Sequence, residues 1–251
     1  MTKDPHILYI HGLGANDHEW DYVKERVGYP STSVLLPGHG TTPEDLKNVT
    51  WYDWVRSVEN TYNKLAKDHR VVLAGMSLGA LVGAHIAARK PDNLAGLVMV
   101  APILYMRDIR ARTLPKASSL FPKILSEAKL REQMFPVDTE SPEAHYTAIP
   151  GQAGFEVLSL GETVRNMLPS VQTSTLHIYT VNDPTVLEPK SSDEVKRVLP
   201  YVRQLPLAVP YHGHLLKPLA GQEHITNIIA YTMQRFIETL SPERTKRIVP
   251  Y

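Results

Sequence analysis

One stretch of the chain restricts its fold more than any other: residues 71–88, VVLAGMSLGALVGAHIAA. It begins with an apolar, β-branched run that is typical of a buried strand and continues into small residues that favour a closely packed helix. Gly75-Met-Ser-Leu-Gly79 lies at the junction. A serine between two glycines at such a junction predicts a sharp turn that exposes the serine hydroxyl. We therefore expect Ser77 on a tight turn, with the first amides of the helix pointing at the same place.

Glycine and serine are common residues, so a Gly-Ser loop before an ordinary helix is the alternative interpretation, and the rest of the chain decides. The 251 residues are 43% hydrophobic and 21% charged, which is typical of one packed α/β domain. The net charge of +1 indicates no field that would attract nucleic acid or an anionic membrane.

The chain has no cysteine, which excludes disulfides, thiolate metal sites and a cysteine nucleophile. We expect neither a cofactor nor a metal. Residues 1–5, MTKDP, show no signal-peptide pattern, and no run approaches the roughly 18 apolar residues of a membrane-spanning helix. The expected location is the cytoplasm, without an integral membrane segment.

Strand and helix patterns alternate along most of the chain. Buried strands are predicted at 6–10, 33–36, 71–74, 94–101, 175–180 and 202–207. Helices are predicted at 18–27, 50–68, 78–88, 155–168, 192–199 and 223–240. This alternation indicates a mostly parallel, doubly wound sheet of six or seven strands with right-handed crossovers.

The alternation breaks after Pro102. Residues 103–150 contain five prolines and helical fragments but no buried-strand run. Because ligands bind beyond the carboxyl ends of such strands, an insertion there is predicted to be a lid, and a surface subdomain is the alternative. We therefore expect a core of residues 1–102 and 151–251, with a small lid at 103–150 after the fourth strand.

A serine needs a base to accept its proton and a third group to orient that base. Asp183 follows the strand 175–180, and His212 and His214 follow the last strand. An aspartate after a strand is often only a turn residue, but its place in the sheet relative to Ser77 favours the orienting role. We favour His214 as the base because it follows a flexible glycine and precedes apolar residues. His212 would then be a supporting or surface residue.

Acyl chemistry at a serine creates a negatively charged oxygen, which two backbone N–H groups commonly stabilise. The residue directly after the serine, Leu78, is one expected donor. The other is expected from the loop after the first strand, residues 11–14 (HGLG), where Leu13 is favoured.

These residues resemble the carboxylesterase and monoacylglycerol lipase group of the α/β-hydrolase superfamily. The resemblance spans nearly the whole chain and is weakest across the insertion. The matching segments are 10–16 (IHGLGAN), 36–40 (LPGHG) with 43–45 (PED), 51–54 (WYDW), 75–80 (GMSLGA), 101–102 (AP), 182–183 (ND) and 213–214 (GH). The order Ser77, Asp183, His214 is also the order of α/β hydrolases. The resemblance implies an α/β-hydrolase fold, a serine nucleophile, an acyl-enzyme intermediate and a small lid over an apolar acyl pocket.

The resulting hypothesis is a serine esterase for short- to medium-chain carboxylic esters or monoacylglycerols. One alternative is the same three residues acting on another bond, as in a peptidase, amidase, lactonase or aryl-ester hydrolase. Another is a non-catalytic binder on this scaffold. The partner would be a small-molecule ester, and an apolar lid surface would also suit pairing with a second copy. Candidate pocket or lid residues are Ile103, Tyr105, Met106, Phe121 and Met134.

Overall fold

A computed structural model describes residues 5–107, 134–136, 146–210, 212, 215–218 and 221–240. The main sheet has six strands, all parallel, in the order β2-β1-β3-β4-β7-β8. Its strands are β1 (His6–Ile10), β2 (Ser31–Val34), β3 (Val71–Met76), β4 (Leu94–Val100), β7 (Thr175–Thr180) and β8 (Val202–Leu207). The predicted parallel α/β sheet is confirmed.

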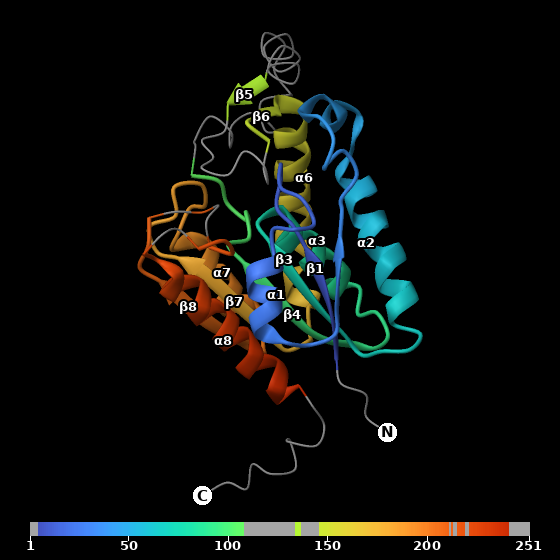
Figure 1. Cartoon of the computed structure of the whole chain (residues 1–251), viewed down its shortest axis with the longest axis vertical. Helices are drawn as coiled ribbons and strands as arrows, with labels where there is room; N and C mark the ends of the chain where they lie inside the picture. Colours follow the sequence, from blue (N-terminus) through green and yellow to red (C-terminus); the bar gives the residue numbers. More distant parts are fainter. Residues whose placement is uncertain are drawn as a thin grey trace, which may run out of the picture.

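Helices cover both faces of this sheet, as Figure 1 shows. The first face is covered by α1 (Asp21–Val27) and α8 (Glu223–Thr239), which also contact each other. The second face carries α2 (Trp51–Leu65), α3 (Leu78–Ala88), α6 (Gly151–Met167) and α7 (Lys190–Val198). Two short 3₁₀ helices, η1 (Pro43–Asn48) and η4 (Leu168–Ser170), join the second layer. A sheet between two helical layers leaves its strand ends open for a site.

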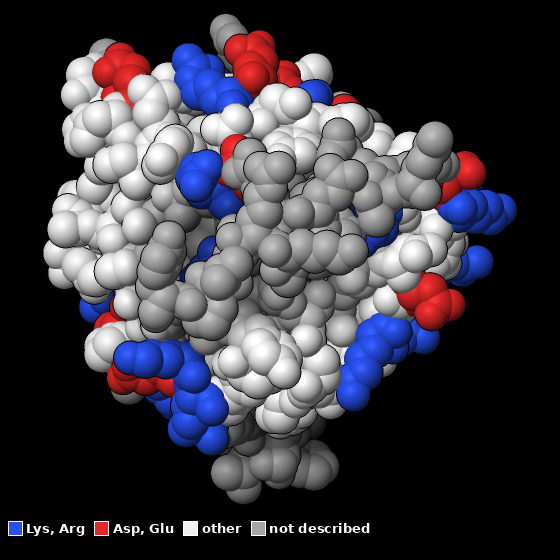
Figure 2. All heavy atoms as spheres, turned by 90° about the horizontal axis from the view of Figure 1, so that it is seen from below, with Lys and Arg blue, Asp and Glu red and all other residues white. Residues whose placement is uncertain are grey.

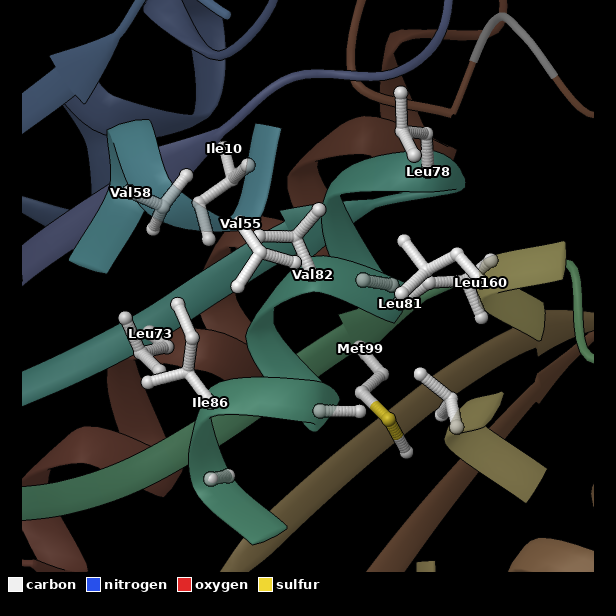
Figure 3. Packing of buried hydrophobic residues seen from close by; sticks show 14 of the residues in the cluster. Ile10, Val55, Val58, Leu73, Leu78, Leu81, Val82, Ile86, Met99 and Leu160 are labelled. Atoms are coloured by element: carbon white, nitrogen blue, oxygen red, sulfur yellow. The ribbon is translucent and has the colours of Figure 1, made fainter. Parts of the chain in front are cut away.

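Helix α3 lies at the centre of the larger hydrophobic core. All of its residues are buried, which is expected of a helix that is apolar on every side. Figure 3 shows Leu81 directed toward Leu160 of α6, and Val82 beside Val55 of α2. The helix is thus enclosed by β3, β4, α2 and α6, so its first turn has little freedom to move.

Strands β7 and β8 have their predicted bounds, but β2 lies two residues earlier than expected. It ends at Val34, which pairs with Ile10, and the next apolar residues leave the ladder because the Leu36 N–H donates to the His11 ring. Helix α1 begins at Asp21 instead of residue 18, since residues 16–20 form turns. Helix α6 begins four residues early, directly after Pro150.

The region after β4 contains a short antiparallel pair, β5 (Met134–Pro136) and β6 (Ala148–Pro150). No strand was expected there, and the pair is separate from the main sheet. Figure 1 shows the pair beyond the carboxyl ends of the main strands, at the end opposite to the two termini. This position suits the predicted lid, which stays a prediction because residues 108–133 and 137–145 lie outside the described part of the chain.

Charges of both signs are interspersed on the face that Figure 2 shows. Lys and Arg side chains lie beside Asp and Glu around its rim, in agreement with the net charge of +1. In the part of the chain that the structure describes, no helix is long and apolar enough to cross a membrane.

Candidate active site

Ser77 lies on the turn between β3 and α3, in a strained conformation with φ 53° and ψ −109°. Positive φ is unfavourable for a residue with a side chain, and the surrounding structure must enforce it. The flanking glycines allow the turn: a Cβ on Gly75 would lie 2.1 Å from the Gly79 carbonyl oxygen, and one on Gly79 would lie 2.2 Å from that of Ile10. The predicted tight serine turn is therefore confirmed.

Three side chains from distant segments form one hydrogen-bonded chain at this turn. His212 Nε2 lies 2.9 Å from Ser77 Oγ, and His212 Nδ1 lies 2.8 Å from Asp183 Oδ2. Because a carboxylate only accepts hydrogen bonds, Nδ1 carries the proton, and Nε2 is left to accept the serine hydroxyl. The ends of β3, β7 and β8 thus bring a hydroxyl, a carboxylate and an imidazole together.

Asp183 is 1% exposed, and four groups donate hydrogen bonds to its carboxylate. The N–H groups of Thr185 and Val186 reach Oδ1 at 2.7 and 2.8 Å, while the Thr180 hydroxyl and His212 reach Oδ2. Burial by itself raises the pKa of Asp183, but the hydrogen bond and charge of His212 together with the two N–H donors outweigh burial and lower it. The carboxyl group therefore stays ionised and can orient the imidazole.

The sequence-based choice between the two loop histidines is corrected by this geometry. We favoured His214 as the base, but His212 makes both contacts, and His214 lies outside the described residues. The error has a physical cause: the two histidines flank one glycine, and spacing alone does not decide which ring faces the serine. The sequence did offer His212 as a candidate, because His212 also follows the last strand.

The two expected N–H donors lie beside the serine. Leu78 is the first residue of α3, so its N–H has no partner within the helix. A Cβ on Gly12 would lie 3.5 Å from Ser77 Cβ, which brings the loop of Leu13 next to the serine. Within the described part of the chain, neither the Leu13 nor the Leu78 N–H donates a hydrogen bond. The role of both N–H groups as oxyanion donors stays a prediction.

Two polar side chains that the sequence reasoning did not single out hold this loop. His11 Nδ1 donates to the Gly12 carbonyl at 2.8 Å, while its Nε2 accepts the Leu36 N–H at 3.0 Å. Glu19 Oε2 accepts the Gly12 N–H at 2.8 Å. The HGLG segment already pointed to His11. By contrast, no local sequence pattern distinguishes Glu19 from an ordinary residue near the start of a helix.

The predicted pocket residues have mixed outcomes. Ile103 is buried in the main core. Tyr105 and Met106 pair through their backbones with Leu187 and Val186, and the Tyr105 hydroxyl donates to Glu194. Ile103 thus packs in the core, while Tyr105 and Met106 lie against the segment that follows Asp183, and the Tyr105 side chain also contacts α7. Phe121 lies outside the described residues, as does the side chain of Met134, so the acyl pocket stays a prediction.

Metal ligands do not gather anywhere in the described ranges: no group of three or more His, Asp or Glu side chains there is arranged to hold an ion.

Comparison with known proteins places this geometry in context. The sequence model of the alpha/beta hydrolase family matches residues 7–220. A structure described as "LipS and LipT, two metagenome-derived lipolytic enzymes" superimposes with a TM-score of 0.78, covering 95% of both chains at 21% identity. The monoacylglycerol lipase of Paleococcus ferrophilus superimposes with a TM-score of 0.69 at 15% identity, covering 94% of this chain and 97% of that one. At these identities the likeness shows the fold alone.

Curated relatives match a shorter segment. The thermostable monoacylglycerol lipase of Bacillus sp. (strain H-257) is 32% identical over 98 residues, which are 38% of this chain and 39% of that protein. Esterase Rv0045c of Mycobacterium tuberculosis is 37% identical over 98 residues, which are 38% of this chain and 32% of that protein. The match thus spans less than two fifths of the length of these relatives.

Proposed function

The chain belongs to the alpha/beta hydrolase family, and on that premise we propose that it is a serine esterase that hydrolyses carboxylic esters through an acyl-enzyme intermediate. The observation that carries the proposal is the hydrogen-bonded chain Ser77–His212–Asp183 on a strained serine turn. The base lies within hydrogen-bonding distance of both the nucleophile and the orienting acid, as acyl transfer to serine requires.

In the first half of the reaction, Ser77 Oγ attacks the ester carbonyl while His212 Nε2 accepts the serine proton. Asp183 stabilises the imidazolium that forms, because its carboxylate stays ionised and bonded to Nδ1. The carbonyl oxygen becomes an oxyanion and accepts hydrogen bonds from the Leu13 and Leu78 N–H groups, with the positive end of α3 beside it. His212 then donates its proton to the departing alcohol, which leaves the acyl group on Ser77.

In the second half, a water molecule attacks the acyl-enzyme, with His212 again accepting a proton. The second oxyanion uses the same two N–H groups, and its collapse releases the acid and returns the proton to Ser77. The reaction needs no group beyond the residues named and water.

Short- to medium-chain acyl esters or monoacylglycerols are the proposed substrates. A thermostable monoacylglycerol lipase and an esterase are among the relatives that share sequence with this chain, which supports an ester as the substrate. Residues 103–150 are proposed to form a lid, because both ends of this segment lie at the carboxyl edge of the sheet, near the serine.

The test is hydrolysis of p-nitrophenyl esters of increasing acyl length by the wild type and the variant Ser77→Ala. Loss of the nucleophile is expected to lower kcat by about 10⁴-fold or more. Ser170→Ala is the matched control, because Ser170 is an exposed serine away from the site, and it should keep full activity. Equal activity of the wild type and Ser77→Ala would contradict the proposal.

A panel of matched esters, amides and lactones tests the bond that is cleaved. The ester should be preferred, and preference for an amide or lactone would keep the mechanism but overturn the substrate class. Fluorophosphonate labelling of Ser77 separates an enzyme from a non-catalytic binder. Folded protein that resists a saturating probe would favour the binder.

A further inference from the structure

Glu19 is a buried carboxylate beside the proposed oxyanion-binding loop, residues 11–14. It is 7% exposed, and its Oε2 accepts the Gly12 N–H at 2.8 Å. Its backbone is fixed, because the Glu19 N–H donates to Asn16 and the next residue, Trp20, is fully buried and donates its indole N–H to Ile10. Burying a carboxylate is unfavourable unless it is well bonded, so a buried carboxylate that accepts the Gly12 N–H suggests that this hydrogen bond has a role.

The peptide that Glu19 binds is held on its opposite side by the nucleophile turn. A Cβ on Gly79 would lie 2.7 Å from the His11 carbonyl oxygen, so this oxygen lies against the first turn of α3. In a trans peptide the carbonyl and the following N–H point in opposite directions. The His11–Gly12 peptide is therefore held between the Glu19 carboxylate and the backbone of Gly79.

The next peptide carries the proposed donor. The Gly12 carbonyl accepts hydrogen bonds from His11 Nδ1 at 2.8 Å and from the Ala15 N–H at 3.3 Å. The Leu13 N–H belongs to the same peptide and must point the other way. A Cβ on Gly12 would lie 3.5 Å from both Glu19 Oε1 and Ser77 Cβ, so the carboxylate and the serine both lie next to Gly12.

We propose that Glu19 is a positioning residue, which holds the loop 11–14 against the nucleophile turn so that the Leu13 N–H is oriented before substrate binds. This inference rests on the proposed function, because it assumes that an oxyanion forms at Ser77. Such donors are effective because they need no reorientation during the reaction. Without the Glu19 acceptor, the Gly12 N–H would seek another partner, and the loop would leave the orientation that the serine turn requires.

The experiment compares Glu19→Ala, Glu19→Asp and Glu19→Gln with a matched control, Glu156→Ala. Glu156 Oε2 also accepts a backbone N–H, that of Trp51 at 3.0 Å, but at the start of α2. For each variant, kcat and KM are measured for a p-nitrophenyl ester. Inhibition by an alkyl boronic acid, whose tetrahedral adduct with serine mimics the oxyanion, is measured separately. Melting temperatures report stability separately.

Loss of an oxyanion donor commonly lowers kcat by about 10²–10³-fold, so disordering the loop in Glu19→Ala should lower kcat by about 10–100-fold. KM should change little, and boronic acid inhibition should weaken by a similar factor. Glu19→Asp should resemble Glu19→Ala, because the shorter side chain does not reach Gly12. Glu19→Gln should retain most of the activity, because its amide oxygen can accept the same N–H. Glu156→Ala should lower only the melting temperature.

Several results would overturn the inference. Unchanged kcat and inhibition in Glu19→Ala would show that Glu19 only supports the fold, as would failure of both Glu19→Ala and Glu19→Asp to fold. A Glu19→Gln variant as impaired as Glu19→Ala would show that the charge matters instead of the acceptor. These outcomes are distinct from failure of the proposed function, which would appear as hydrolysis that survives Ser77→Ala.

Discussion

The nucleophile turn and the loop that carries His212 reach the same site by different structural means. The turn is continuous with β3 and α3, and its shape is set by backbone atoms in close contact. The His212 loop follows β8 and reaches the site through one imidazole, and Leu215 and Leu216, farther along the chain, are buried in the core. Close backbone contacts tolerate no added atoms, whereas a side-chain contact can be removed without a clash.

This difference separates stability from activity. Substitutions in the turn should destabilise the fold, because the glycines let a strand and a helix meet. Substitutions of the His212 ring should remove activity while the fold remains. Substitutions in the turn and in the residues around it can test this separation.

His212→Ala and His214→Ala test which histidine serves the turn. Since His212 contacts both Ser77 and Asp183, its removal should lower kcat by about 10⁴–10⁶-fold, as losing a base of this kind does. His214→Ala should stay within a few-fold of the wild type. Steady-state ester hydrolysis measures both, and circular dichroism checks that each variant is folded. The reverse pattern would restore His214 as the base.

Gly79→Ala tests the turn itself. The new Cβ would lie 2.2 Å from the Ile10 carbonyl oxygen, so β1 and α3 would have to separate. We expect a loss of about 4 kcal/mol in the free energy of unfolding, or no folded protein at all. Gly154→Ala is the control, because a Cβ there meets nothing within 4 Å in helix α6; it should be neutral or stabilising by about 0.5–1 kcal/mol. Urea unfolding measures the stability of both variants. A fully stable Gly79→Ala variant would contradict the conclusion that close backbone contacts set the shape of the turn.

Lowering the pH should reduce the free energy of unfolding, because His39 is buried in its neutral form. Burial lowers the pKa of His39 to about 4, and the His39 ring packs edge-on against the ring of His11, the first residue of the loop 11–14. Between pH 6.5 and 4 the unfolded chain binds a proton that the folded chain does not, so the free energy of unfolding falls as the pH decreases. The contribution of His39 is about 3 kcal/mol across this window.

Urea unfolding at several pH values measures this effect. His39→Gln should flatten the slope between pH 6.5 and 4, whereas His224→Gln, at an exposed histidine, should leave it unchanged. Burial also lowers the pKa of His177 to about 3, so a residual slope of the same sign should remain in His39→Gln. An unaltered slope in His39→Gln would show that His39 does not remain neutral in the folded protein.

Tyr146→Phe tests how the end of the insertion is held. The Tyr146 hydroxyl donates to the Gly38 carbonyl at 2.9 Å and accepts the Thr41 N–H at 3.1 Å. Its loss should cost about 1–2 kcal/mol in the free energy of unfolding, with a small effect on activity. Tyr52→Phe is the control, because Tyr52 is 65% exposed and should change stability by less than about 0.5 kcal/mol. Equal stability of the two variants would show that the hydrogen bonds of the Tyr146 hydroxyl do not stabilise the fold.

Much of the architecture could be predicted because its signals are local. The capping box of Thr50 and Asp53 and the apolar runs of β1 and β7 determine their own conformations within a few residues. Predictions failed where tertiary contacts override such signals. Leu36 continues an apolar run, yet it leaves β2 because its N–H donates to the His11 ring.

The serine turn can be predicted from the local sequence alone, since the strain at Ser77 and the need for Gly75 and Gly79 follow from backbone sterics over five residues. The sequence also indicated the position of Asp183, which follows β7 by three residues and therefore lies at the carboxyl edge of the parallel sheet, where it contacts His212. By contrast, the contact of His212 with the serine and the contact of Glu19 with the loop 11–14 depend on tertiary packing. His212 contacts a serine 135 residues away in the chain, and residue spacing does not encode which of two neighbouring histidine rings points toward so distant a partner.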